Sequence, residues 1–280
     1  MGNRRSERIR VGIVGASPHG GWGIAAHLPA LAHLDEFDVT AVATTSQTSA
    51  QQTADAFGIP HASASAGDLV VHPDVDLVVV SVKAPAHAEV IRAAVAAGKH
   101  VFSEWPLGVD LAESTDLAKA ATAAGVVHAI GLQGYQSPPA RFVKDLLAEG
   151  RIGRVESVGL VAAGDPLGGS QIPQGLAWGT DPATGNTLLT IMVGHALATL
   201  DHVVGRLAEV SAVVANLNDQ VVVAETGQRI PNGAPSQVAL HGRLDGGAVV
   251  SVSVHGGNLS NPDGFFLKIT GTGGTLAITP

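Results

Sequence analysis

Hydrophobic residues in the first half of the chain follow two patterns in turn. Continuous β-branched runs predict buried strands, and the segments between them carry apolar residues at helical spacing. The predicted strands are residues 8–16, 37–45, 75–83, 100–104 and 126–133. The predicted helices are residues 22–34, 49–58, 86–99 and 111–125. Apolar strands that alternate with amphipathic helices predict a doubly wound, parallel α/β sheet covered on both faces.

The pattern changes at Pro138. Helices are predicted at 138–153 and 187–205, and the other periodic segments alternate apolar and polar residues, as half-buried strands do. These strands are residues 154–164, 208–217, 236–244, 247–257, 264–272 and 274–280. Short glycine turns such as DGG and GTGG between strands are typical of antiparallel hairpins. The second half therefore predicts an α+β domain with an open, mostly antiparallel sheet.

Composition excludes several classes of protein. Hydrophobic residues make up 45% and charged residues 14% of the 280 positions, which is typical of a compact domain. The formal net charge of −8 argues against direct nucleic-acid binding. The absence of cysteine excludes disulfides, thiolate metal sites and thiol nucleophiles. The most apolar strand-like run, 75–82, is far shorter than the about 20 residues that span a bilayer. We expect a cytoplasmic protein that makes no membrane contact.

The loop after the first strand, GASPHGGWG, is the first candidate site. A dinucleotide-binding loop needs glycines for a tight turn, for backbone approach to the pyrophosphate and for close helix packing. Gly12, Gly15 and Gly23 can serve these needs, and Ser17 stands where the middle glycine is expected. The alternative is a glycine-rich turn without function. The strand–loop–helix context favours a Rossmann nucleotide site.

The end of the second strand bears on the choice of cofactor. An NAD site usually has a carboxylate there for the ribose 2′-hydroxyl, but this strand ends ATTSQT. Thr44, Thr45 and Ser46 can donate hydrogen bonds to a 2′-phosphate without repelling it, although no arginine is near to neutralise the phosphate. The cofactor is predicted to be NADP or NAD, with a tilt towards NADP. The alternative is that these residues simply end a strand.

Several stretches carry a resemblance to a known family. They include VGIVGAS, GWGIAAHLPAL, AGKHVFSEWPLG, LLAEGRIGRV and GNTLLTIMVGHALATLDHVVG. These stretches resemble the Gfo/Idh/MocA family of NAD(P)-dependent oxidoreductases, and they look closest to its galactose-regulon repressor-like branch. That branch has Glu-Trp where other members have Glu-Lys, and it has a similar GW loop, here with Trp22. The resemblance implies a Rossmann domain followed by an open sheet that holds substrate and mediates oligomers.

The resemblance also organises the chain into domains. We expect a flexible tail at 1–7, a dinucleotide-binding domain at 8–134 and a substrate and oligomerisation domain at 135–280. Family members continue past the strand that ends this sequence, so the second domain is expected to be truncated at its C-terminus. The alternation in VSVSVHGG would leave one apolar face of the sheet bare in a lone domain, so a homodimer or homotetramer is predicted.

The family's proton-transfer residues are only partly present. The resemblance implies a lysine beside the nicotinamide, and an aspartate and a histidine four residues apart on a helix. Mapped onto this chain, the lysine is Trp105, the aspartate is Thr190 and the histidine is His195. An indole cannot transfer a proton, so His195 is the candidate catalytic residue, and Trp105 is expected to provide a flat wall beside the nicotinamide or a sugar. The alternative for His195 is a satisfied structural histidine.

Other polar residues follow the predicted strands of the first domain. We assign Lys83, His87, Glu104 and Gln133 to cofactor contact, against the alternatives of solvation, capping and turn roles. Trp178 lies where the family often has Trp-Arg for substrate, but the arginine position is Gly179. The candidate substrate-binding residues are Trp105, Trp178, Thr190 and His195. No histidine spacing predicts a metal site.

Two functions remain open on the sequence. The first is an NAD(P)-dependent oxidoreductase that acts on a sugar, a polyol or a related secondary alcohol or carbonyl. The second is a non-catalytic, dinucleotide- and sugar-sensing regulator of the repressor type. The replacement of the lysine and the aspartate favours the regulator, whereas the usual activity of the family favours the enzyme.

Overall fold

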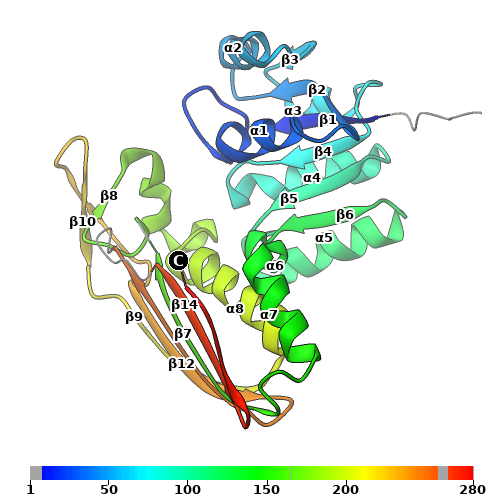
Figure 1. The fold of residues 1–280 in the computed structure, drawn as a ribbon. Helices are drawn as coiled ribbons and strands as arrows, with labels where there is room; N and C mark the ends of the chain where they lie inside the picture. Colours follow the sequence, from blue (N-terminus) through cyan, green and yellow to red (C-terminus); the bar gives the residue numbers. More distant parts are fainter. Residues whose placement is uncertain (1–7, 165, 258–263, 280) are drawn as a thin grey trace, which may run out of the picture. The chain divides into compact units, whose positions relative to one another are not determined.

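The protein divides into two compact units, residues 1–131 and 132–280. Its structure is a computed structural model that describes residues 8–164, 166–257 and 264–279. The tail expected at 1–7 lies outside the described residues. The sequence predicts the domain boundary after residue 134, near the division between the units. Figure 1 shows the helices and strands of each unit.

The first unit is built on one parallel sheet. Its strands are β1 (Ile9–Val14), β2 (Phe37–Ala43), β3 (His61–Ser63), β4 (Leu77–Val80), β5 (His100–Glu104) and β6 (His128–Gly131). They lie in the order β3-β2-β1-β4-β5-β6, and every pair of neighbours is parallel. The order reverses between β1 and β4, which is the position at which doubly wound sheets bind ligands. The predicted α/β sheet is confirmed.

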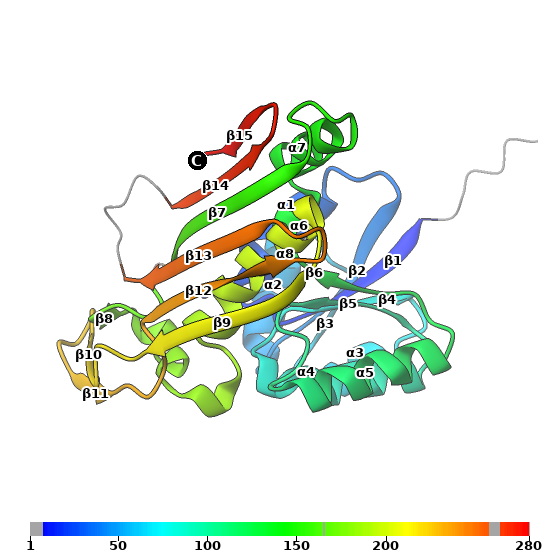
Figure 2. The same ribbon diagram turned by 90° about the horizontal axis from the view of Figure 1, so that it is seen from below.

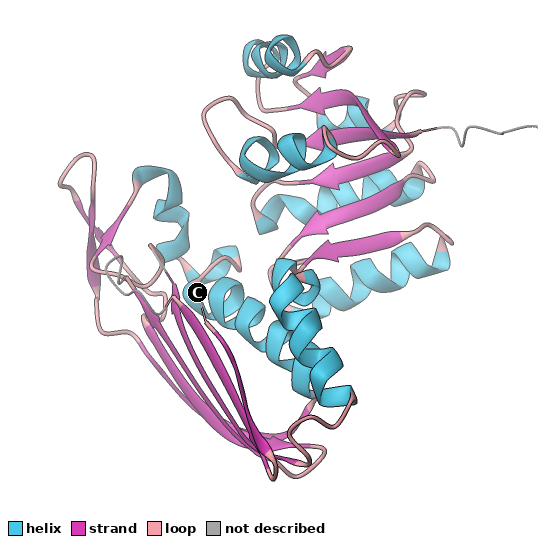
Figure 3. Cartoon of the chain, in the orientation of Figure 1, coloured by secondary structure: helices cyan, strands magenta, loops and turns pink. Residues whose placement is uncertain are grey.

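Helices cover both faces of this sheet, as Figure 3 shows. The π-helical turn η1 (Gly23–His27), α1 (Leu28–Leu31) and α2 (Gln47–Phe57) share one hydrophobic cluster with β1 and β2. The helices α3 (Ala66–Val70), α4 (His87–Ala96) and α5 (Leu111–Ala123) share a second cluster with the same strands and β4. The strand β3 and the helix α3 were not predicted, because segments this short show no readable periodicity.

Arginine side-chain contacts fix the amino-terminal edge of this sheet. Arg10 in β1 donates from Nε and Nη2 to the two carboxylate oxygens of Asp76, at 2.9 and 2.7 Å, and from Nη1 to Asp74 at 3.0 Å. These hydrogen bonds from the guanidinium lower the pKa of Asp76 to about 2. The contacts attach the loop before β4 to the start of β1.

The second unit is built on a mixed sheet of six strands, which we call the large sheet. Figure 2 shows it in a different orientation. Its strands are β7 (Val155–Gly164), β9 (Leu207–Ala215), β12 (Gln237–Leu244), β13 (Val249–Gly256), β14 (Phe265–Gly271) and β15 (Gly274–Ile278). The order is β15-β14-β7-β13-β12-β9; β7 and β13 are parallel, and the other neighbours are antiparallel. The predicted open, mostly antiparallel sheet is confirmed.

Shorter elements complete the second unit. A small sheet contains β8 (Gln171–Ile172), β10 (Gln220–Val223) and β11 (Arg229–Pro231), none of which was predicted. The helical elements of the second unit are α6 (Gln133–Gln136), α7 (Pro138–Ala148), η3 (Gln174–Thr180), η4 (Pro182–Thr184), η5 (Leu188–Val193) and α8 (Gly194–Val204). The first unit also has a short 3₁₀ turn, η2 (Ala84–Ala86). None of the helices in the described ranges has the length and apolar character needed to cross a membrane.

The helices α7 and α8 cover one face of the large sheet, and this contact corrects one prediction. Val250, Val252 and Val254 of β13 are at most 3% exposed, because they pack in one cluster with apolar residues of α7 and α8. The residues that β13 leaves exposed are Val249, Ser251 and Ser253, which lie on the opposite face. The apolar side of VSVSVHGG is therefore covered within the chain, and the argument from a bare valine face was wrong.

Candidate functional site

The loop after β1 has two glycine positions at which the backbone leaves no room for a side chain. Gly15 has a φ of +105°, and a Cβ on it would lie 2.2 Å from the backbone oxygen of Ser81. Gly23 opens the turn η1, and a Cβ there would lie 3.0 Å from the Cα of Ala16. Both positions therefore require glycine, one for its backbone conformation and close approach and the other for packing. This is the chain geometry that a dinucleotide-binding loop needs.

The remainder of this loop is tightly folded. Ser17 and Gly20 close a turn in which the Gly20 N–H donates to the Ser17 oxygen at 3.1 Å. This turn contains the residues that interrupt the expected glycine spacing. Gly12 lies within β1 and packs against Leu69, whose Cδ2 would lie 2.7 Å from an added Cβ. Trp22 is 49% exposed just before η1.

A buried hydroxyl lies next to the glycine loop. Among the described residues, Ser81 Oγ is a buried side-chain atom without a hydrogen-bond partner. Ser81 follows β4, and its backbone oxygen is the atom that Gly15 approaches. Buried polar groups in proteins are nearly always paired. An unpaired hydroxyl beside Gly15, where no side chain fits, suits a site in which the ligand supplies the hydrogen-bond partner, and a dinucleotide is a ligand of that kind.

The residues after β2 are engaged with the start of α2. Ser46 caps this helix, and its Oγ accepts a hydrogen bond from the Ser49 N–H at 3.2 Å. Thr44 Oγ1 donates to the Ser46 carbonyl at 2.9 Å and is hydrogen-bonded to Ser49 Oγ. Thr45 is exposed. The first turn of α2 has no acidic residue, so its positive end has no carboxylate to repel a 2′-phosphate. The preference for NADP stays a prediction.

Sequence reasoning missed His27, the partner of Glu104. His27 Nε2 and Glu104 Oε1 are 2.7 Å apart, with side chains only 15% and 14% exposed. The imidazole also packs edge-on against Phe102, with ring centroids 5.5 Å apart. Gly131 leaves space for the carboxylate, because a Cβ there would lie 2.8 Å from Glu104 Oε1. The pair joins the turn η1 to the carboxyl end of β5, and only the helical spacing of HLPAL hinted that His27 faces the sheet.

The other residues assigned to this edge differ in exposure. His87 is 1% exposed; its Nε2 donates to the Val82 carbonyl at 2.9 Å, and its Nδ1 lies 3.4 Å from Ser103 Oγ. Its ring nitrogens therefore already have protein partners. Lys83 is exposed at the start of η2, and Trp105 is partly buried after β5. Cofactor contact by these residues stays a prediction.

The helix that carries His195 begins with a π-helical turn. The predicted helix is divided into η5, which is π-helical, and α8. Thr187 and Thr190 form a capping box, in which the Thr187 N–H donates to Thr190 Oγ1 at 2.8 Å. Thr190 and His195 are five residues apart, one more than the family spacing. Because a π-helix hydrogen-bonds residues i and i+5, the extra residue still leaves these positions on one side of the helix.

His195 lines a cavity of about 300 Å³ within the second unit. The wall combines polar and apolar side chains from α6, α7, η5 and α8 and from the strands β7, β14 and β15. It includes Gln133, Ser137, Met192, Thr199 and Phe265. The structure therefore brings Gln133 together with His195, whereas the sequence had grouped it with Glu104.

The segment before η5 contains Gly179, at the position where the family often has an arginine, and the space around it is small. Gly179 is buried, and a Cβ on it would lie 2.6 Å from Leu167 Cδ2. An arginine there would require Leu167 to move. Trp178 is partly buried, and its indole N–H donates to the Gly175 carbonyl at 2.7 Å. Substrate contact by Trp178 stays a prediction.

Two family profiles together match almost the whole chain. Residues 9–132 match the oxidoreductase family with an NAD-binding Rossmann fold, GFO_IDH_MocA. Residues 138–280 match the C-terminal domain of Gal80p. The first unit is thus a NAD-binding Rossmann domain, as the glycine loop indicates.

Individual relatives include both enzymes and regulators. The dehydrogenase aclE of Aspergillus oryzae is 31% identical over 287 residues, which cover 97% of this chain and 76% of aclE. The galactose/lactose metabolism regulatory protein GAL80 of Saccharomyces cerevisiae is 27% identical over 96% of this chain. The chain spans 66% of the length of GAL80.

Solved structures divide in the same way. A super-repressor mutant of Gal80p from Saccharomyces cerevisiae matches with a TM-score of 0.90 at 26% identity, over 98% of this chain and 75% of that one. Levoglucosan dehydrogenase in complex with NADH and levoglucosan matches with a TM-score of 0.85 at 25% identity, over 98% of this chain and 73% of that one. The glycine loop, the profile matches and the similarity to aclE lead to one conclusion: the chain belongs to the Gfo/Idh/MocA family of oxidoreductases, with a second unit of the Gal80p type.

Proposed function

We propose that the protein is an NAD(P)-dependent oxidoreductase that interconverts a secondary alcohol and a carbonyl on a sugar or polyol. The observation that carries this proposal is His195 in the wall of a cavity of about 300 Å³, on the helix where the family's histidine is expected. The dehydrogenase aclE and levoglucosan dehydrogenase support the choice of reaction and substrate class.

The residues of each unit have their own proposed tasks. The backbone at Gly15 and Gly23 admits the dinucleotide, and Ser81 Oγ can hydrogen-bond to it. Bound NAD or NADP supplies the hydride acceptor or donor. Trp105 provides a flat apolar surface without a titratable group. In the oxidative direction, His195 accepts the proton of the substrate hydroxyl as the hydride leaves the carbon, and in the reductive direction it returns this proton.

A non-catalytic sensor is the second candidate. Its support is the Thr190 hydroxyl, which is used in the capping box and cannot take the place of a carboxylate in proton transfer. Trp105 also stands where relatives keep a lysine. A protein of this kind would bind dinucleotide and a sugar-like ligand and would report their presence to another protein. The similarity to GAL80, a galactose/lactose metabolism regulatory protein, supports a regulatory role.

Turnover separates the two candidates. The protein would be mixed with NAD⁺ or NADP⁺ and a panel of sugars and polyols, and reduced nicotinamide would be followed by absorbance. We expect slow turnover that His195→Asn abolishes while nucleotide affinity stays the same. His202→Asn is the matched control, because His202 lies on the same helix and is not part of the cavity wall. No turnover by the wild type, with intact nucleotide binding, would favour the sensor.

The same proposal includes pairing of two chains through the outer face of the large sheet. Val161, Ser253, Ala239 and Val213 form one row across four strands, and Val213 is 69% exposed. Small and apolar side chains in a flat row suit face-to-face packing of two sheets. Light scattering should give the mass of at least a dimer, and Ala239→Arg should shift it towards the monomer. A wild-type monomer at high concentration would contradict this part of the proposal.

A further inference from the structure

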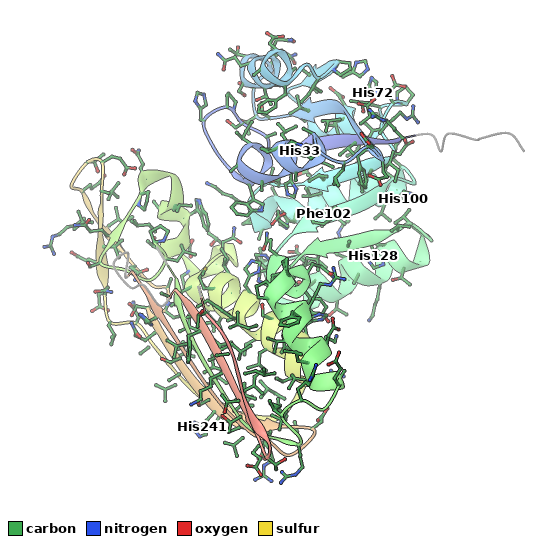
Figure 4. The ribbon with its side chains drawn as sticks, in the orientation of Figure 1. His33, His72, His100, Phe102, His128 and His241 are labelled. Atoms are coloured by element: carbon green, nitrogen blue, oxygen red, sulfur yellow. The ribbon has the colours of Figure 1, made fainter. Side chains whose placement is uncertain are left out.

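Three potential metal ligands converge at the amino-terminal edge of the first sheet. They are His61 at the start of β3, His72 after α3 and Asp74 before β4, and their ligand atoms lie within 4.8 Å of one another. His61 Nε2 is 3.4 Å from Asp74 Oδ2, and the rings of His61 and His72 have centroids 4.1 Å apart. Figure 4 labels His72 at this edge, followed by His100 and His128. We call His61, His72 and Asp74 the edge cluster.

The backbone of the edge cluster is held in place before any ligand binds. The Asp74 carbonyl accepts a hydrogen bond from Thr40 Oγ1 at 2.6 Å, and Arg10 holds Asp74 Oδ1. The His72 carbonyl accepts from Lys99 Nζ at 3.1 Å. His61 pairs with Ala41 in the ladder of β2 and β3. A metal ion would therefore have to reorient side chains only, which keeps the ordering needed for binding small.

The polar groups around the cluster leave one carboxylate oxygen for a metal. Arg10 occupies Oδ1 of Asp74, so Oδ2, which faces His61, is the remaining ligand atom. Arg10 and Lys99 are the nearby cations, and Asp74 and Asp76 balance them. A divalent ion therefore enters a region that is close to neutral.

We propose that the edge cluster binds a transition-metal ion such as Zn²⁺, Ni²⁺ or Co²⁺, one per chain. Imidazole nitrogens with one carboxylate oxygen suit these borderline ions, whereas Mg²⁺ and Ca²⁺ require oxygen ligands. Three protein ligands leave a fourth position for water in a tetrahedral site. Spacing in the sequence could not show this site, because its residues come from three elements that meet only in the fold.

Hydrogen bonding in the cluster makes the site optional for folding. The Asp74 N–H donates to His72 Nδ1 at 3.1 Å, so the neutral ring carries its proton on Nε2. Coordination through Nε2 moves that proton to Nδ1 and breaks this hydrogen bond. Competition of this kind weakens metal binding, so we expect a micromolar site in a protein that is folded without metal.

The site is independent of the proposed oxidoreductase reaction. Within the parallel sheet, the edge cluster lies at the starts of strands, and the glycine loop follows the end of β1. A metal ion here joins β3 to the loop before β4, so it should raise the thermal stability of the protein. Nucleotide affinity should stay the same.

Titration of the full chain, without a histidine tag and after chelator treatment, tests the proposal. Calorimetry with Zn²⁺ should show one micromolar site, and Co²⁺ should give the strong visible absorption of a four-coordinate ion. His61→Ala and His72→Ala should each weaken binding by about 100-fold, since even second-shell changes weaken metal sites by about 10–100-fold. Both variants should remain folded, because these side chains are only partly buried.

His100→Ala and His128→Ala are the matched controls. These histidines lie at the starts of β5 and β6, on the same edge but outside the edge cluster, and their loss should leave the Zn²⁺ titration unchanged. Equal weakening by a control variant would show scattered binding to surface histidines and would overturn the proposal. A wild type with neither a calorimetric site nor the Co²⁺ absorption would overturn it as well.

Discussion

The glycine loop of the first unit and the helix η5–α8 of the second relate differently to the family to which the chain belongs. The loop keeps the backbone geometry that dinucleotide binding requires, with Gly15 against Ser81 and an unpaired hydroxyl beside it. The helix keeps the histidine, but Thr190 stands at the carboxylate position and its hydroxyl caps the helix. In the proposed function, cofactor binding and proton transfer therefore depend on different features of the chain. One depends on steric fit, and the other depends on titratable groups.

The largest effect is expected from filling the glycine loop. Gly15→Val should lower the affinity for NAD(P) by about 100-fold or more, which is about 2.8 kcal/mol. The added side chain clashes with the Ser81 backbone, which cannot rotate away. The valine would also have to adopt the φ of +105° that Gly15 has, which is unfavourable for a residue with a side chain. Calorimetry with both nucleotides measures the effect, and circular dichroism checks the fold.

Gly20→Ala is the control for this prediction. Gly20 is in the same loop and also has a positive φ, +121°, but nothing lies within 4 Å of an added Cβ. Its substitution introduces backbone strain of about 1–2 kcal/mol without the clash. Equal losses in the two variants would mean that strain, and not the lack of space beside Ser81, explains the Gly15 effect.

The second prediction restores the family's titratable groups. The double variant Trp105→Lys and Thr190→Asp should raise kcat on sugars by about 100-fold, because a positioned acid or base typically contributes 10²–10⁴-fold. Nucleotide affinity should change much less. Steady-state kinetics measures the gain, and the single variants show whether each group contributes. A sensor would show no turnover in any of these variants.

The third prediction concerns the partly buried pair of His27 and Glu104, which the sequence did not reveal. His27→Ala should destabilise the protein by about 1–3 kcal/mol, since it leaves the carboxylate of Glu104 without this partner in a poorly hydrated place. Denaturant unfolding measures the loss. The double variant with Glu104→Gln should lose less than the sum of the single variants, and additive losses would show that the two side chains do not interact.

Two quantities decide how much of the structure the sequence predicts: the length of each helix or strand, and the distance along the sequence between residues that contact each other. Periodicity predicted α5 to within two residues, because a helix of 13 residues repeats its apolar spacing often enough to be read. It missed β3, α3 and the small sheet of β8, β10 and β11, whose residues number five or fewer in each element. It also could not distinguish a π-helical turn from an α-helix, so the spacing of Thr190 and His195 was explained only by the structure.

For the candidate site, local signals were readable and tertiary pairs were not. The glycines of the loop were predicted because each has a steric task that depends on adjacent residues. The His27–Glu104 pair and the edge cluster join residues that are 77 and up to 13 positions apart, and no spacing rule predicts such contacts. The exposed face of the large sheet was misjudged, because the sequence does not say which face α7 and α8 cover.

The smallest predicted effect is a pH dependence in the second unit. Burial lowers the pKa of His202, and Lys144, whose Nζ lies 3.4 Å from Nδ1, lowers it further. The unfolded chain therefore takes up this proton at a higher pH than the folded chain does, so the free energy of unfolding falls as the pH drops below about 6.5. His202→Gln should make the free energy of unfolding fall less steeply between pH 7 and pH 5. His241→Gln, at an exposed position on β12, should leave that dependence unchanged, and an equal change in the two variants would show that burial of His202 is not the cause.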